Sequence, residues 1–94
     1  MNEIIANMEM ELDDLRAELA DKSGSKVLEH AYEIVTKQAL IDFFYAHTEF
    51  LESYLAELKK LKNPLEFFYS EWLGYDGGLQ DALGSFVTNT VESL

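Results

Sequence analysis

The residues best placed for metal chemistry are His30 and Glu33, which lie three apart in a stretch with helical periodicity. On a helix this spacing puts an imidazole and a carboxylate on one face, where both could bind a single metal ion. His47 is the only other histidine, and the chain has no cysteine. We therefore expect His30 to be partly exposed and paired with a neighbouring acid, and we expect neither a metal nor a cofactor.

Nucleophilic catalysis is not indicated by the remaining polar residues. The six serines all stand in contexts typical of helix caps or helix surfaces, where no base activates them. Gly77 and Gly78 precede a predicted helix and could bind an anion at its N-terminus. Asp76 and Asp81 flank these glycines with the wrong charge, so a turn is the better interpretation. The sequence predicts that this protein is not an enzyme.

Charge is the strongest property of the chain, which holds eighteen acids and seven bases and has a net charge of −11. The surplus lies at the two ends, because residues 1–21 contain seven acids and one base, and residues 63–94 contain five acids and no base. Lys and Arg dominate affinity for the phosphate backbone, so direct binding to nucleic acid is disfavoured. A protein with a basic surface is the natural partner.

Residues 3–21 have the pattern of an amphipathic helix. Its apolar side chains recur with a helical period of 3.5 to 3.6 residues, at Ile4, Ile5, Met8, Leu12, Leu15 and Leu19. Acids cover the rest of the circumference, and Met10 is the one apolar residue among them. We predict that five of these acids contact a partner: Glu9, Glu11, Asp14, Glu18 and Asp21.

Three interpretations of this helix remain open. Its acidic face can simply be a solvated surface that keeps a small apolar protein soluble. The same carboxylates can instead imitate phosphates and occupy a basic groove on another protein. Alternatively, the stripe of Met8, Leu12, Leu15 and Leu19 can form the seam of a two-stranded homodimer.

Two aromatic tripeptides follow an acid in the same way, Phe43-Phe44-Tyr45 after Asp42 and Phe67-Phe68-Tyr69 after Glu66. Three consecutive residues of a helix spread over about 200° of its circumference, so one buried stripe cannot hold all of them. We expect several neighbours to cover the first tripeptide, and Phe68 and Trp72 to be core residues. Phe67, Tyr69 and Tyr75 cannot all point inward with them, and Tyr and Trp are enriched at interfaces, so we predict partner contacts for these three rings.

The other elements are predicted as helices near residues 26–45, 48–61, 63–74 and 79–94, joined by short loops. Thr48 is a suitable N-cap for the second of these. Asn63, Pro64 and Glu66 predict the start of the third through an N-cap, a proline at the first helical position and a capping box. Gly84, inside the last helix, indicates a close helix crossing. No segment alternates with period two, so we predict an all-α fold, a compact antiparallel bundle of four to five helices in a single domain spanning residues 1–94.

The composition is that of a folding chain, with 48% hydrophobic residues and 13% aromatic residues. No apolar run approaches the roughly 20 residues that cross a bilayer, and the first residues lack the features of a signal peptide. We expect a cytoplasmic protein with no membrane partner. The absence of cysteine fits a reducing compartment.

Two segments carry a likeness to a known family: Val27-Leu28-Glu29-His30-Ala31-Tyr32-Glu33, and Leu61-Lys62-Asn63-Pro64-Leu65 leading into Glu71-Trp72-Leu73. With them the chain resembles a domain-of-unknown-function family of small acidic helical proteins encoded in phages and conjugative elements of Gram-positive bacteria. It departs from that family in the aromatics at Phe43-Phe44-Tyr45 and in the Gly-rich turn after Tyr75. The family has no assigned chemistry, so the resemblance implies no catalytic residue. It implies a mobile-element setting, in which small acidic proteins often bind host machinery.

Two functions are consistent with the sequence. The first is a protein-binding module, an inhibitor or adaptor that engages a basic, nucleic-acid-handling host defence protein through acidic helices. The alternative is an obligate helical homodimer with a structural or regulatory role and no charge mimicry. Their sensitivity to salt distinguishes them, because screening weakens contacts between exposed charges far more than contacts between apolar side chains.

Overall fold

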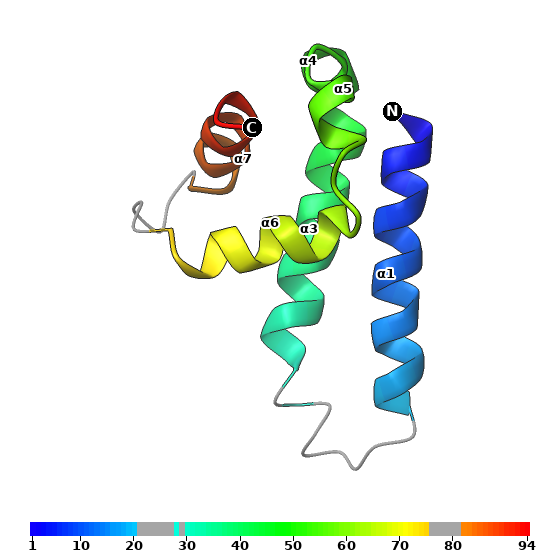
Figure 1. Cartoon of the computed structure of the whole chain (residues 1–94). Coiled ribbons are helices and arrows are strands. Elements are labelled where there is room, and N and C mark those ends of the chain that lie inside the picture. Colours follow the sequence, from blue (N-terminus) through cyan, green and yellow to red (C-terminus); the bar gives the residue numbers. More distant parts are fainter. Residues whose placement is uncertain (21–27, 29, 76–81) are drawn as a thin grey trace.

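The computed structural model describes residues 1–20, 28, 30–75 and 82–94, and these residues form six helices and no strand. The prediction of an all-α fold is confirmed. Helix α1 (Asn2–Ala20) and helix α3 (Ala31–Ala46) run antiparallel side by side, and α6 (Pro64–Leu73) crosses both (Figure 1). Helix α7 (Ala82–Glu92) packs on α6, and in this view it lies on the opposite side of the molecule from α1.

The predicted helix over residues 48–61 is interrupted. Two short helices replace it, α4 (Thr48–Glu52) and α5 (Leu55–Leu58). Between them the backbone tightens, because the N–H groups of Ser53 and Tyr54 bond to carbonyls three residues back, at 3.3 and 2.9 Å. The prediction that Thr48 caps this segment is wrong, since His47 holds the N-cap position and its side chain makes no capping hydrogen bond.

The core lies where α1, α3 and α6 meet. From α1 it takes the predicted stripe, of which Met8 is 0% and Leu12 is 2% exposed, whereas Leu15 is half-buried. Met10 lies on the outer face, as predicted. Since Met8 and Leu12 are buried within their own chain, the prediction that this stripe forms a homodimer seam is wrong.

Phenylalanines join α3, α6 and α7. Phe44 packs edge to face against Phe68 with 5.3 Å between ring centroids, and Phe68 meets Phe86 of α7 in the same way at 6.4 Å. All three rings are buried. Neighbouring elements cover Phe44 fully and Phe43 partly, but Tyr45 is 56% exposed, so the expectation that neighbours cover the whole tripeptide is wrong for this residue. Trp72, predicted as core, is half-buried and contacts Phe86 at 5.3 Å.

Helix α7 also approaches α3. A Cβ atom added to Gly84 would lie 3.6 Å from a ring carbon of Phe43, which is an ordinary van der Waals contact. The crossing predicted at Gly84 is thus present, but it does not require a glycine. The predicted start of the helix near Lys26 and the predicted turn at Gly77-Gly78 lie outside the described residues.

Candidate functional site

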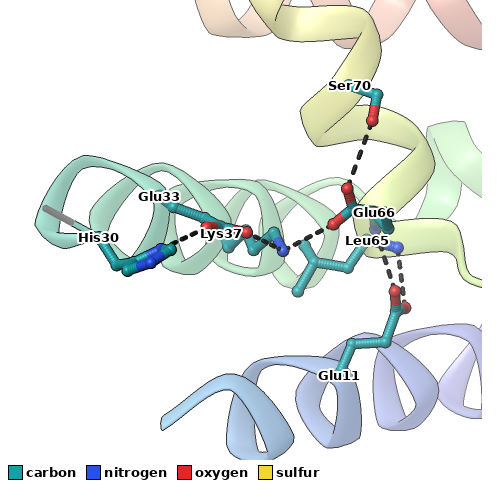
Figure 2. Close-up of polar contacts among 7 residues, drawn as sticks. All are labelled: Glu11, His30, Glu33, Lys37, Leu65, Glu66 and Ser70. Carbon is teal, nitrogen blue, oxygen red and sulfur yellow. Dashed lines mark hydrogen bonds and ion pairs between the residues drawn. The ribbon is translucent and has the colours of Figure 1, made fainter. Parts of the chain in front are cut away.

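Helix α6 begins against the flank of α1, where a carboxylate caps it. Glu11 of α1 accepts hydrogen bonds from the backbone N–H groups of Leu65 and Glu66, at 2.9 and 3.0 Å, one on each oxygen (Figure 2). The first N–H groups of a helix have no partner in their own helix and form its positive end, so a carboxylate is favourable there. Both oxygens of Glu11 are therefore used within the chain.

The environment of Glu11 changes its acidity. Burial raises the pKa of this carboxyl above its ordinary value of 4.5, and it outweighs the two backbone hydrogen bonds and the charge of Lys37, which lower the pKa. The neighbouring charge of Glu66 raises the pKa further. Glu11 is thus a half-buried acid that joins two helices, unlike the solvated acids around it.

The capping box predicted at the start of α6 is wrong in its details. Asn63 holds the N-cap position and Pro64 the first helical position, as predicted, but the Asn63 side chain makes no capping hydrogen bond. The Glu66 side chain turns away from the cap and accepts hydrogen bonds from Lys37 and Ser70, at 2.8 and 3.4 Å. The capping acceptors that Asn63 would have provided come from Glu11.

Among the residues that the structure describes, Lys37 is the one charged residue that is buried. Its ammonium group donates to Glu33 of the same helix at 2.6 Å and to Glu66 of α6 at 2.8 Å (Figure 2). The side chain is 6% exposed, and the Nζ atom lies 5.1 Å from the centre of the Tyr69 ring. Lys37 thus ties α3 to α6 with the Glu66 ion pair and the cation–π contact to Tyr69, while its second ion pair, to Glu33, lies within α3.

These contacts shift the pKa of each partner. Burial acts to lower the pKa of Lys37, but the hydrogen bonds and charges of Glu33 and Glu66 outweigh it and raise the pKa above 10.5. Burial acts to raise the pKa of Glu33, but hydrogen bonds and charges from Lys37 and His30 outweigh it and lower the pKa below 4.5. His30 lies 3.2 Å from Glu33 and is partly exposed, which confirms the predicted pairing with an acid.

An acidic groove runs between α1, α3 and the start of α6, with a volume of about 360 Å³. Six ionisable side chains line it: Glu11, Asp14, Glu18, Glu33, Lys37 and Glu66. Five carboxylates thus surround one ammonium group, which is itself bonded to two of them. Asp14 and Glu18 are exposed, so they face the solvent on the α1 side of the groove.

The predicted acids are therefore divided between different roles. Glu11, Asp14 and Glu18 lie together in the acidic groove, where Glu11 caps α6. Glu9 is exposed on α1 and accepts a hydrogen bond from the hydroxyl of Tyr45. Asp21 lies outside the described residues.

The aromatic residues predicted to contact a partner also lie in different places. Phe67, Tyr69 and Tyr75 are all half-buried and pack against the core. Phe67 and Tyr75 line one pocket with Glu71 and α7. Tyr69 lies elsewhere, near Lys37 and with its ring 6.5 Å from that of Tyr32, whose hydroxyl accepts a 2.7 Å hydrogen bond from Trp72.

Sequence reasoning overlooked Lys37 entirely. A local signal existed, since Glu33 and Lys37 are four residues apart, a spacing at which opposite charges on a helix meet. No such signal existed for the cap, because Glu11 and Leu65 are 54 positions apart. Only the packing of α6 across α1 brings them together.

Comparison with known protein families, curated proteins and solved structures finds no match to this chain. Within residues 1–20, 28, 30–75 and 82–94, no three histidine, aspartate or glutamate side chains gather as a metal site would need. In that same part of the chain, no helix is both long and apolar enough to cross a membrane.

We predict that Glu11→Ala lowers the free energy of unfolding by about 1 kcal/mol, the usual cost of losing a helix cap. The reason is that two backbone N–H groups of α6 lose their acceptor. Urea unfolding followed by circular dichroism measures the loss, with Asp14→Ala as the control on the same helix. The control should change stability by less than about 0.5 kcal/mol. Equal effects of the two substitutions would show that the cap contributes nothing.

We predict that Lys37→Met destabilises the fold at pH 7 by about 2 kcal/mol, because Glu33 and Glu66 lose their shared counter-ion. The low pKa of Glu33 and the high pKa of Lys37 mean that the pair contributes fully between pH 4.5 and 10.5. The difference from wild type should therefore shrink as the pH falls through the folded pKa of Glu33.

Unfolding of both proteins across the acid range measures this difference, and Lys60→Met, at an exposed lysine, is the control. A deficit that stays constant as Glu33 is titrated would contradict the proposed ion pair.

Proposed function

We propose that this chain is a non-enzymatic protein-binding module that uses its acidic surface to engage a basic protein. The acidic groove supports the proposal most directly, because it presents carboxylates from three helices around a single ammonium group. An acidic surface steers a basic partner toward it and repels other acidic molecules. The exposed acids Asp14 and Glu18 are the residues that we assign to the contact.

Rigidity supports the same proposal. The Glu11 cap and the ion pairs of Lys37 hold α1, α3 and α6 together on both sides of the groove. Carboxylates with a fixed spacing lose little conformational entropy when a partner binds, as in any preorganised interface. Such a surface can act as a substitute for a phosphate backbone.

The resemblance to small acidic proteins of phages and conjugative elements extends this proposal. In that setting, the basic partner is a nucleic-acid-handling host protein, such as a defence enzyme, and the chain is its inhibitor or adaptor. A cytoplasmic location belongs to the same proposal, since such a target works beside nucleic acid.

One observation favours the alternative function, a homodimer. Two apolar side chains at the start of α3 are exposed, Tyr32 by 57% and Val35 by 68%, and Leu28, which precedes the helix, is exposed by 76%. The spacing of three residues keeps Tyr32 and Val35 on one face of α3, where they form an exposed stripe. A second copy could bury this stripe without bringing the acidic groove into the interface.

We predict that the double substitution Asp14→Asn with Glu18→Gln removes the basic partner from material captured out of a lysate of a Gram-positive bacterium. The control is Glu49→Gln with Glu92→Gln, which removes two exposed acids on α4 and α7 and so the same charge. Quantitative mass spectrometry compares the captured proteins. Binding through exposed charges should also disappear at a few hundred millimolar salt, where the Debye length falls to a few ångströms. Equal capture by the two double variants would rule out the acidic groove.

For the homodimer, we predict that Val35→Glu converts the protein to a monomer, because a buried carboxylate in the stripe would have no partner. Sedimentation equilibrium in low and high salt measures the mass. A dimer that persists in high salt and is lost in Val35→Glu supports the alternative. A monomeric wild-type protein at every concentration contradicts it.

A further inference from the structure

A second hollow lies between α6 and the C-terminal end of α7. Helix α7 lies on the opposite side of the molecule from α1 in the view of Figure 1. The hollow has a volume of about 260 Å³. Its walls combine two aromatic rings, one aliphatic side chain, one side-chain carboxylate and several neutral polar groups, from Phe67, Glu71, Tyr75, Asn89, Thr90, Ser93 and Leu94. We call this hollow the α6–α7 pocket.

The two rings of the α6–α7 pocket are held in place by other aromatic residues. Tyr75 stacks on Trp72 with 6.1 Å between centroids and an interplanar angle of 25°, and it contacts Phe86 at 5.3 Å. Phe67 packs edge to face against the buried Phe68 at 5.3 Å. The pocket thus has fixed aromatic faces, and such faces attract cations.

The polar wall of the pocket carries negative charge. Glu71 is exposed and contributes a full negative charge. Helix α7 ends at Glu92, and the N–H of Ser93 bonds to the carbonyls of Asn89 and Thr90, at 3.2 and 3.1 Å. These carbonyls belong to the last turn, which is the negative end of the helix dipole.

No positive charge in the sequence segment that lines the pocket offsets the negative charge of its polar wall. Residues 63–94, which supply all the described residues of the pocket lining, contain no lysine, arginine or histidine. Among the residues that the structure describes, the lining therefore joins aromatic rings, a carboxylate and a helix C-terminus and includes no cation.

We propose that the α6–α7 pocket binds the side chain of an arginine. A guanidinium group is flat, stacks on aromatic faces, and carries five N–H donors that suit a carboxylate and amide or hydroxyl oxygens. The ammonium group of lysine is compact and strongly hydrated, so it gains less from two rings. Glu71 is the counter-ion, Phe67 and Tyr75 provide the stacking surface, and Asn89 and Thr90 provide neutral acceptors.

This inference rests on the proposed function for the origin of the arginine, which would belong to the basic partner. The partner would then be held at two places, with its basic surface on the acidic groove and one arginine anchored in the α6–α7 pocket. Arginines that fill pockets are typical of residues that dominate binding energy at interfaces.

The test is a titration of the whole isotope-labelled chain with N-acetyl-argininamide, followed by NMR of the backbone amides. The parallel probes are N-acetyl-lysinamide and the neutral isostere N-acetyl-citrullinamide. We expect argininamide to shift the amides of Asn89, Thr90 and Tyr75 in a saturable way, with weaker binding of lysinamide and none of citrullinamide. Glu71→Gln should weaken argininamide binding about tenfold, the effect of losing one charge-assisted pair. Glu49→Gln, at an exposed acid of α4, should leave it unchanged.

Three results would overturn the assignment. These are the absence of saturable shifts at the pocket, lysinamide binding as tight as argininamide, and equal effects of Glu71→Gln and Glu49→Gln. The titration needs no protein partner, so its failure would leave the capture experiment with Asp14 and Glu18 unaffected. Failure of that capture would likewise leave the titration valid.

Discussion

The backbone N–H groups at the start of α6 need acceptors from another part of the chain, and this requirement organises one whole side of the molecule. Because α6 crosses α1 and α3, its first turn lies against α1, and Glu11 supplies both acceptors. The same turn carries Glu66, which reaches Lys37 on α3. A single helix start is thus bonded to both of the antiparallel helices beneath it, and the apolar contacts of Leu65 and Phe68 close the same junction.

This junction determines how the surplus of acid is arranged. A net charge of −11 destabilises a compact chain by self-repulsion, and some of that repulsion is relieved where carboxylates meet N–H groups or Lys37. The acids that remain exposed, such as Asp14 and Glu18, lie beside the internally bonded ones along the acidic groove. The fold therefore supplies the groove with a base of internally bonded acids and an outer row of exposed ones.

Structural features that depend on residues close together in the sequence could be predicted from it. Features that depend on contacts between distant residues could not. Apolar periodicity predicted α1 with its buried Met8 and Leu12, and Pro64 predicted the start of α6. The break at Tyr54 was not predicted, because the buried Leu51 and Leu58 lie seven residues apart, a spacing that a continuous helix would satisfy equally well. The contacts of the candidate site were harder to predict from the sequence than the helices. Its acids could be named from the pattern on α1, but the separate role of Glu11 arises from a contact 54 positions away.

The repeated aromatic tripeptide shows how one local pattern can serve several purposes. The middle rings, Phe44 and Phe68, contact each other in the core, since each occupies the inward face of its helix. The residues before and after them point elsewhere because neighbours on a helix are about 100° apart. Phe43 and Phe67 each line a hollow against α7, whereas the tyrosines, Tyr45 and Tyr69, meet Glu9 and Lys37. The pairing of the two central rings therefore fixes the register of α3 against α6, and that register in turn positions the aromatic walls on both sides of α7.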